Sequence, residues 1–285
     1  MQSQSRVAHP SLPMPRAAQL LREHGFRAWY DQQVQTFLQR YAGGQAFHYP
    51  SFSQRCGRAT RPLGNTQDLL AYNVLYASAH FGRMQALLKP VVFIDAKQPA
   101  QTLHLKVFDY GCGQGLATLA LLEHLKGLPV VLEVHLVEPS LLALQVAQQY
   151  VHAQAGHCGI EVQVQAHACG LDQLPDDAFV LQPGQLGVHL FSNVLDLESQ
   201  QVFDLGTLAR QIQSAAGEHL CLAVSPDHFG GKAGFDRLQA VLAPAECWLD
   251  TPRLSALVHT YRLREGMTWH TVQGRALILM VRVGQ

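Results

Sequence analysis

The segment Val107–Gly115 combines an acidic residue with closely spaced glycines and reads VFDYGCGQG. Within it, Asp109 is followed by Gly111, Gly113 and Gly115. Glycines at alternate positions let a backbone turn sharply and approach a ligand where any Cβ atom would collide. A strand pattern precedes the glycines and a helix pattern follows them, so we expect a ligand-binding turn between a strand and a helix.

Two common phosphate-binding motifs do not fit this turn. A dinucleotide-binding G-x-G-x-x-G would need glycine or alanine at position 116 or 118, where the chain has Leu116 and Thr118. A P-loop would need Gly-Lys-Ser/Thr, whereas the last glycine of the turn is followed by leucine. The turn is therefore not expected to hold a pyrophosphate.

An acidic residue followed by G-x-G-x-G resembles motif I of the class I S-adenosylmethionine-dependent methyltransferases. The resemblance implies that the loop, including Cys112, lies under the methionine part of the cofactor and that Asp109 helps to fix loop and ligand. The charge agrees, because S-adenosylmethionine carries an ammonium and a sulfonium and has no pyrophosphate. S-adenosyl-L-methionine is therefore the expected cofactor.

A second anchor is expected at Glu138, where the strand pattern of EVHLVEPS ends on a carboxylate. The segment resembles the family's motif II, which implies that Glu138 accepts hydrogen bonds from both ribose hydroxyls and that Pro139 lies beside it. Alternatively, Glu138 is an ordinary strand-end acid and Ser140 caps the next helix. The correctly spaced motif I before it favours the binding role.

Further candidates follow the next two expected strands. Ala168 and Cys169 are predicted to flank the adenine after the third strand. The fourth strand, GVHLFSNVLDL, resembles motif IV, and ligands of open parallel sheets bind outside the carboxyl ends of the strands. Ser192 is therefore a candidate cofactor contact and Asn193 a candidate catalytic residue. Asp196 is a candidate substrate contact, or alternatively starts the following helix.

A catalytic base is required only if the acceptor must lose a proton, because methyl transfer depends mainly on positioning the acceptor. Histidine suits that role near neutral pH. The candidate histidines are His80, His189 and His228, of which His228 is also a candidate substrate contact.

Residues 1–100 have a helical pattern and match no motif. Tyr72, Tyr76 and His80 recur at i, i+4 and i+8, on one face of an expected helix. In the methyltransferase superfamily such an extension commonly caps the cofactor and shapes the acceptor pocket. This implies a lid whose Tyr72 contacts substrate and whose Tyr76 and His80 take part in catalysis; the alternative is an aromatic stripe that only packs in the core.

Metal binding is not expected. Histidines and cysteines between residues 152 and 169 lie close in sequence, but none of their spacings matches a structural zinc signature. The chain has 6 cysteines and no C-x-x-C pair, so we expect free thiols in a reducing compartment.

The order of the patterns predicts the fold class: α/β, a Rossmann-like, doubly wound, mostly parallel seven-stranded sheet with a C-terminal antiparallel hairpin and an N-terminal helical extension. The expected strands are 103–110, 131–137, 161–166, 185–192, 219–225, 254–263 and 275–283, the last two joined by a loop with Gly266 and Gly274. The expected helices are 15–41, 66–88, 115–124, 141–155, 198–216 and 233–241, with a loop over 45–64. We expect an N-terminal lid and substrate-recognition region over 1–100 and an S-adenosylmethionine-binding domain over 101–285.

The composition indicates which kinds of partner the chain is expected to bind. The chain carries 21 Lys plus Arg and 21 Asp plus Glu, so no excess positive charge favours a nucleic acid, and we expect a small-molecule or short-peptide acceptor. No apolar run reaches the length of a membrane span and no signal-peptide pattern opens the sequence, which predicts a cytoplasmic protein.

The predicted function is an S-adenosylmethionine-dependent methyltransferase. Two alternatives keep the same cofactor site. One is transfer of the aminocarboxypropyl group or cyclisation of the cofactor, which releases methylthioadenosine. The other is a non-catalytic S-adenosylmethionine-binding module.

Overall fold

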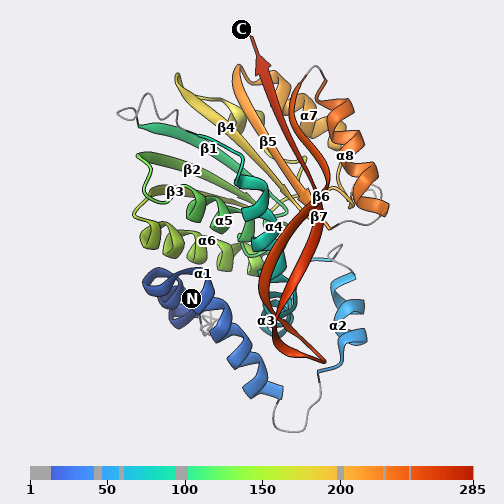
Figure 1. Ribbon diagram of the computed structural model, residues 1–285. Coiled ribbons are helices and arrows are strands. Elements are labelled where there is room, and N and C mark those ends of the chain that lie inside the picture. The colour runs from blue at the N-terminus through green and yellow to red at the C-terminus, as the bar shows by residue number, and fades with distance from the viewer. Residues whose placement is uncertain are drawn as a thin grey trace, which may run out of the picture.

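The computed structural model describes residues 14–41, 47–57, 61–93, 102–197, 202–226, 229–243 and 245–284. Its centre is a seven-stranded sheet in the order β3-β2-β1-β4-β5-β7-β6 (Figure 1). The strands are β1 (Leu103–Tyr110), β2 (Val130–Val137), β3 (Glu161–His167), β4 (Gln185–Ser192), β5 (Gly217–Ser225), β6 (Glu246–Arg262) and β7 (Gly266–Val283). The first five are parallel, and β7 pairs antiparallel with both β5 and β6. The predicted fold class is confirmed.

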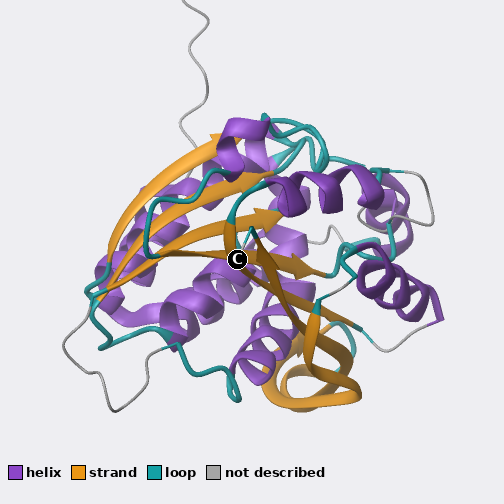
Figure 2. Cartoon of the chain, turned by 90° about the horizontal axis from the view of Figure 1, so that it is seen from above, coloured by secondary structure: helices purple, strands orange, loops and turns teal. Residues whose placement is uncertain are grey.

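The middle strands are rich in apolar residues on both faces, because helices cover both faces of the sheet. On one face pack α1 (Met14–Tyr41), α5 (Leu116–His124), α6 (Leu141–Cys158) and the N-terminal helices, which share a buried cluster. On the other face pack the 3₁₀ turn η3 (Asp176–Phe179), α7 (Leu205–Ser214) and α8 (Phe229–Val241), around a second buried cluster. Figure 2 shows the helices on either side of the curved sheet.

The N-terminal region is more structured than expected. Part of the predicted loop forms the helix α2 (Tyr49–Cys56). The predicted helix over 66–88 consists of α3 (Thr66–Tyr72), a π-helical turn η2 (Asn73–Ala77) and α4 (Ser78–Leu88). Asn65 rather than Thr66 caps it, because the Asn65 side chain accepts a hydrogen bond from the amide of Asp68 at 2.8 Å.

The C-terminal hairpin is longer than predicted. Strands β6 and β7 run beyond the sheet toward the N-terminal helices (Figure 1). Gly274, expected in a loop, lies within β7 opposite Leu254. The Tyr30 hydroxyl of α1 donates to the carbonyl of Val74 at 2.7 Å and accepts from the amide of Tyr261 at 2.9 Å, which ties α1, η2 and β6 together.

Residues on both sides of position 100 belong to one buried cluster, which runs from Leu21 and Trp29 of α1 to Leu132 and Val134 of β2. The N-terminal region is therefore packed against the sheet by a shared core. The boundary expected near residue 100 stays a prediction. None of the helices in the described part of the chain combines the length and the hydropathy that crossing a bilayer requires.

Candidate functional site

The glycine-rich turn leaves β1 and enters α5 as the sequence predicts. Gly111, Gly113 and Gly115 all have positive φ angles of 61°, 53° and 78°, which favour glycine. The turn is held to its neighbours by two backbone bonds: the amide of Cys112 donates to the carbonyl of Val137 at 3.0 Å, and the amide of Gly115 donates to the carbonyl of Cys112 at 2.7 Å.

The three glycines differ in what surrounds them. A Cβ atom on Gly111 would lie 2.7 Å from Cγ1 of Val194, and one on Gly115 would lie 3.3 Å from Cγ2 of Val151. A Cβ atom on Gly113 would meet no protein atom within 4 Å. The first and last glycines therefore permit close packing, whereas the space above Gly113 is open to a ligand.

Asp109 supports the turn from below. It is 1% exposed, and its Oδ2 accepts hydrogen bonds from the amide and the hydroxyl of Thr118 at 3.2 and 2.7 Å. It thereby satisfies one of the free amides at the start of α5. Burial raises the pKa of Asp109 to about 7, against the lowering effect of the Thr118 bonds. Asp109 does not line the pocket described below.

Glu138 links the end of β2 to the turn. Its Oε2 accepts from the amide of Gly113 at 3.1 Å, and its Oε1 accepts from the amide of Ser140 at 2.9 Å. Burial raises the pKa of Glu138, and the two amide bonds counteract the rise. Each carboxylate oxygen keeps a second lone pair for a ligand. Ser140 also caps α6, as the alternative interpretation predicts, since its hydroxyl accepts from the amide of Ala143 at 3.2 Å. The binding role of Glu138 stays a prediction.

A pocket opens at the carboxyl edge of the parallel strands, above the turn. It brings together the expected cofactor residues Gly111, Gly113, Glu138, Pro139 and Ser192 with the expected Tyr72 and Asn193. Its further lining residues are Arg61, Pro62, Leu63, Ala143, Leu171, Val194, Leu197 and Val202. The loop before α3 is fastened over it, because the Ser140 hydroxyl donates to the carbonyl of Leu63 at 2.6 Å.

The end of β4 has an unusual backbone. Asn193 has a φ of 60°, and it is the single non-glycine residue with positive φ in the described ranges. Asparagine tolerates this conformation better than most residues, and such strain concentrates at functional sites. Its Nδ2 donates to the Ser192 hydroxyl at 2.8 Å, and its Oδ1 accepts from Arg83 of α4 at 3.2 Å.

Arg83 was not among the residues predicted from the sequence. It is 6% exposed, and burial lowers its pKa to about 10, so it remains charged at neutral pH. The sequence signal was an arginine directly before Met84, in the apolar pattern of a helix. That signal is weak, because arginine on a helix usually extends its stem along the surface and keeps its charge in water.

Tyr72, Tyr76 and His80 are brought together as their spacing predicts. Ring centroids are 5.1 Å apart for Tyr72 and Tyr76, 5.8 Å for Tyr72 and His80, and 6.1 Å for Tyr76 and His80. Burial raises the pKa of Tyr72, which also lies within electrostatic reach of the Glu138 and Asp196 carboxylates. Burial lowers the pKa of His80 to about 3, so His80 is neutral at physiological pH. The Tyr76 hydroxyl is 2.9 Å from that of Tyr49 and lies outside the pocket.

His189 lies on the opposite face of the sheet from α4. It is fully buried, stacks on Phe108 with centroids 4.9 Å apart, and its ring nitrogens are 2.9 Å from the Tyr110 hydroxyl and 3.0 Å from Nδ1 of His219. Burial lowers its pKa well below the usual value. The structure does not bring His189 to the pocket.

Three further predicted residues, Ala168, Cys169 and Asp196, do not line the pocket. Ala168 is exposed and Cys169 half-buried after β3, and neither lines the pocket. Asp196 lies in a turn after β4, and α7 begins at Leu205 with Asp204 as its cap, so Asp196 does not start that helix. His228 lies outside the described residues. Within the described ranges, no group of three or more His, Cys, Asp or Glu side chains is placed to hold a metal ion.

Known proteins resemble the chain in structure and not in sequence. A putative class I S-adenosylmethionine-dependent methyltransferase from Listeria monocytogenes is 12% identical, with 93% of this chain and 84% of that chain covered and a TM-score of 0.40. The small RNA methyltransferase HEN1 is 14% identical, with 70% and 25% covered and a TM-score of 0.44. The geranyl diphosphate C-methyltransferase of Streptomyces coelicolor, solved with Mg²⁺, geranyl diphosphate and S-adenosyl-L-homocysteine, is 12% identical, with 64% and 75% covered and a TM-score of 0.35. No family model and no curated protein matches.

The order of the strands decides the fold. Five parallel strands are followed by an antiparallel pair, with β7 inserted between β5 and β6 and the glycine-rich turn after β1 at the middle of the sheet. The mostly parallel sheet with a C-terminal antiparallel hairpin is as predicted, whereas the insertion of β7 between β5 and β6 was not predicted. The chain has a Rossmann-like α/β fold.

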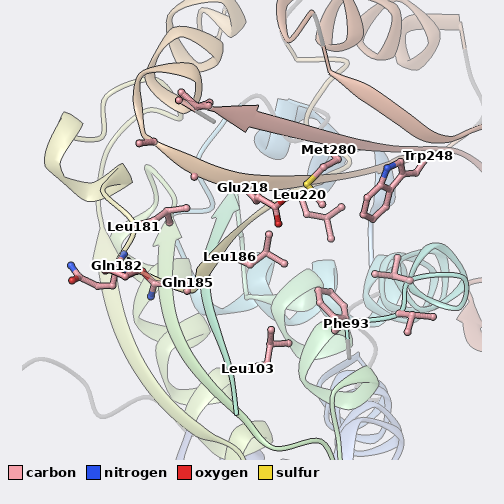
Figure 3. A pocket seen from close by; sticks show the side chains of 18 residues that line it. Phe93, Leu103, Leu181, Gln182, Gln185, Leu186, Glu218, Leu220, Trp248 and Met280 are labelled. Atoms are coloured by element: carbon pink, nitrogen blue, oxygen red, sulfur yellow. Dashed lines mark hydrogen bonds between the residues drawn. The ribbon is translucent and has the colours of Figure 1, made fainter. Parts of the chain in front are cut away.

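The two ends of the parallel strands each carry a pocket. A larger pocket lies at the amino ends of β1, β4 and β5, and Figure 3 shows Leu103, Leu186, Glu218, Leu220 and Trp248 around it. None of the predicted site residues lines it. Ligands of open α/β sheets bind at the carboxyl ends of the strands, so the smaller pocket over Gly113 is the candidate site.

Proposed function

We propose that this protein is an S-adenosylmethionine-dependent methyltransferase acting on a small molecule or a short peptide. The observation that carries the proposal is the open space above Gly113, bordered by the Glu138 carboxylate on one side and by Asn193 on the other. A strand-end acid with unused lone pairs beside a backbone without a side chain suits a ribose and a methionine chain.

The residues present fit this cofactor. Glu138 is held in place by two backbone amides, so its remaining lone pairs are preoriented for two hydroxyl donors. Asp109 lies behind the turn and contributes negative charge when it is ionised. When bound, S-adenosylmethionine supplies a methyl group on a sulfonium, which needs no further activation.

The remaining residues would position the acceptor and exclude water. Tyr72 lines the pocket from the N-terminal region, and the bond from Ser140 to the carbonyl of Leu63 fixes the adjoining loop. Asn193 presents its side chain at the end of β4, beside the open space. An in-line displacement at carbon depends on the orientation of the reacting groups. Correct positioning of the acceptor would therefore account for most of the expected rate acceleration.

A small acceptor is favoured by charge. The 21 cationic and 21 anionic side chains balance, and the described residues lining the pocket include one cation, Arg61, and one acid, Glu138. A nucleic-acid acceptor would be expected to bind an excess of cations along its backbone.

The test is incubation of the purified protein with S-adenosylmethionine and a metabolite extract, followed by mass spectrometry of the by-products. We expect S-adenosylhomocysteine. Methylthioadenosine would indicate transfer of the aminocarboxypropyl group or cyclisation, and tight cofactor binding without either product in any extract would indicate a non-catalytic module. Parallel reactions with total RNA and DNA test acceptor size, and nuclease-sensitive methyl incorporation would contradict the small-acceptor proposal.

A further inference from the structure

Arg83 occupies a position that the chain makes room for. A Cβ atom on Gly274 of β7 would lie 2.8 Å from Cδ of Arg83 and 2.5 Å from the carbonyl oxygen of Ser225 at the end of β5. Glycine at position 274 therefore lets the arginine stem pass the end of β5 and the middle of β7. From there the guanidinium reaches the end of β4, where it donates to Oδ1 of Asn193.

The charge of Arg83 is not balanced by any acid in the described part of the chain. Its one hydrogen bond there is to the neutral amide of Asn193, and its Nε is buried without a partner among the described residues. No described carboxylate lies within 4 Å of it. A buried guanidinium without a counter-ion is costly, because its lost hydration is not replaced.

The two other described cations that are at least half-buried, the buried Lys106 and the half-buried Arg275, have acidic partners. Lys106 is 3.4 Å from Oε1 of Glu133. Arg275 is 3.2 Å from Oδ1 of Asp236 and 3.1 Å from Oδ1 of Asp250. Arg83 is thus a buried cation without a counter-ion among the described residues. It does not itself line the pocket, but its bonding partner Asn193 does, which puts the guanidinium directly behind the pocket wall.

The place of Arg83 relative to Glu138 indicates which ligand would meet it. Glu138 follows β2, whereas the Arg83 stem passes the end of β5 and the middle of β7, and its guanidinium reaches the end of β4. Strands are spaced about 4.8 Å apart, so β5 lies about 14 Å across the sheet from β2. The ribose is assigned to the β2 side, so the acceptor is the ligand expected on the β4 and β5 side.

We infer that the acceptor carries a carboxylate, or a like anionic group, which Arg83 binds beside Asn193. The inference rests on the proposed function and names the class of its substrate. Arginine suits the task because its planar fork can bind both oxygens of a carboxylate. The bond to Asn193 uses one Nη2 proton and leaves the other donors of the guanidinium for the ligand.

The first test compares the stability of two ligand-free variants. In Arg83→Met the stem is retained and an unbalanced buried charge is removed, so we expect the Tm to stay level or rise. In Lys106→Met, the matched control, the Glu133 carboxylate and the Val180 carbonyl lose their buried cationic partner, and we expect the Tm to fall by roughly 3 °C or more. An equal fall in Arg83→Met would show that a group of this chain already balances Arg83, and would overturn the inference.

The second test asks for the anion directly. Thermal shifts are measured with acetate, benzoate and 3-phenylpropionate and with the three corresponding amides, each with S-adenosylhomocysteine present. We expect at least one carboxylate to stabilise the wild-type protein more than its amide, and this difference to vanish in Arg83→Met and persist in part in Arg83→Lys. Equal shifts for every acid and its amide, or an unchanged difference in Arg83→Met, would contradict the inference.

A third measurement separates the acceptor from the cofactor, which has a carboxylate of its own. Calorimetry with S-adenosylhomocysteine should give the same affinity for wild type and Arg83→Met. A loss of about tenfold or more, about 1.4 kcal/mol, would assign Arg83 to the cofactor's carboxylate and overturn the acceptor assignment. If wild type binds no S-adenosylhomocysteine, the proposed function fails, whereas the acid and amide comparison, repeated without it, still tests Arg83.

Discussion

The amide of Gly113 donates a hydrogen bond of 3.1 Å to Oε2 of Glu138, so the turn after β1 and the end of β2 form one unit. The same carboxylate accepts from the amide of Ser140 at the start of α6. A ligand that binds Glu138 therefore meets a group whose position is set by two separate segments. Because the carboxylate is already held in place, less conformational entropy is lost when a ligand binds.

Glu138→Ala should weaken binding of S-adenosylhomocysteine by about 2 kcal/mol, because charge-assisted hydrogen bonds to the ligand are lost. Glu133→Ala is the matched control, since Glu133 lies on β2, the strand that Glu138 follows, but contacts Lys106 and His135 outside the pocket. Calorimetry should give wild-type affinity for the control. Wild-type affinity in both Glu138→Ala and Asp109→Ala would place the cofactor elsewhere.

Gly113→Ala should abolish or strongly reduce cofactor binding while the protein still folds. The added methyl group meets no protein atom, so the expected cost in stability is about 1 kcal/mol from the positive φ alone. The methyl group would, however, occupy the proposed ligand space. Gly127→Ala, with a φ of 83° and equally open surroundings, is the control for the backbone cost. Equal affinities for the two variants would mean that the space above Gly113 holds no ligand.

Asp109 should make stability depend on pH. Its pKa is raised from 3.8 to about 7, so the folded state holds a proton that the unfolded state has lost between these values. The contribution of Asp109 to stability is therefore full below about pH 4 and decreases as the pH rises to about 7, by at most about 4 kcal/mol. Urea unfolding at pH 5, 6, 7 and 8 should show Asp109→Asn gaining stability relative to wild type. Parallel curves for the two proteins would refute the raised pKa.

His80 should make the free energy of unfolding depend on pH in the opposite sense to Asp109. Its pKa is lowered to about 3, so between about pH 3 and 6.5 the unfolded state binds a proton that the folded state does not. Stability is therefore lost as the pH falls below about 6.5. His80→Gln should be less sensitive to acid than wild type in urea unfolding between pH 7 and 5. The same acid sensitivity in both proteins would show that His80 is not desolvated.

The aromatic face of the N-terminal region can be tested by turnover. If Tyr72, Tyr76 and His80 serve the reaction, then Tyr72→Phe, Tyr76→Phe or His80→Ala should lower turnover while thermal stability is preserved. Tyr72 is the strongest of the three, because it lines the pocket. Wild-type turnover in all three variants would remove this helix from the active site.

The sheet could be predicted from the sequence because its middle strands are buried on both faces. Strand β1 has the predicted bounds, Leu103–Tyr110, and the turn after it could be identified because glycines at set intervals have few other uses. The same burial explains why the sequence could not show that the His189 side chain points away from the pocket. A strand with apolar residues on both faces loses its alternation, so the sequence does not show which side chain points to which face.

Contacts between residues far apart in the chain could not be predicted from the sequence. The position of Arg83 depends on Gly274, which lies about two thirds of the chain's length away in sequence, and a glycine near a hairpin is ordinarily read as part of its turn. The π-helical turn Asn73–Ala77 was also not predicted, because its residues have normal helix propensity and the insertion is selected by packing.

The bonds of Tyr30 with Val74 and Tyr261 bear on the order in which the protein can be completed during synthesis. The ribosome releases α1 and α3 before the partner of Tyr30 in β6 and the glycine beside Arg83 in β7. The emerging N-terminal helices expose apolar side chains of the shared core until those strands arrive. Chaperone binding to nascent chains should therefore persist until the hairpin has left the exit tunnel, because the shared core is incomplete without it.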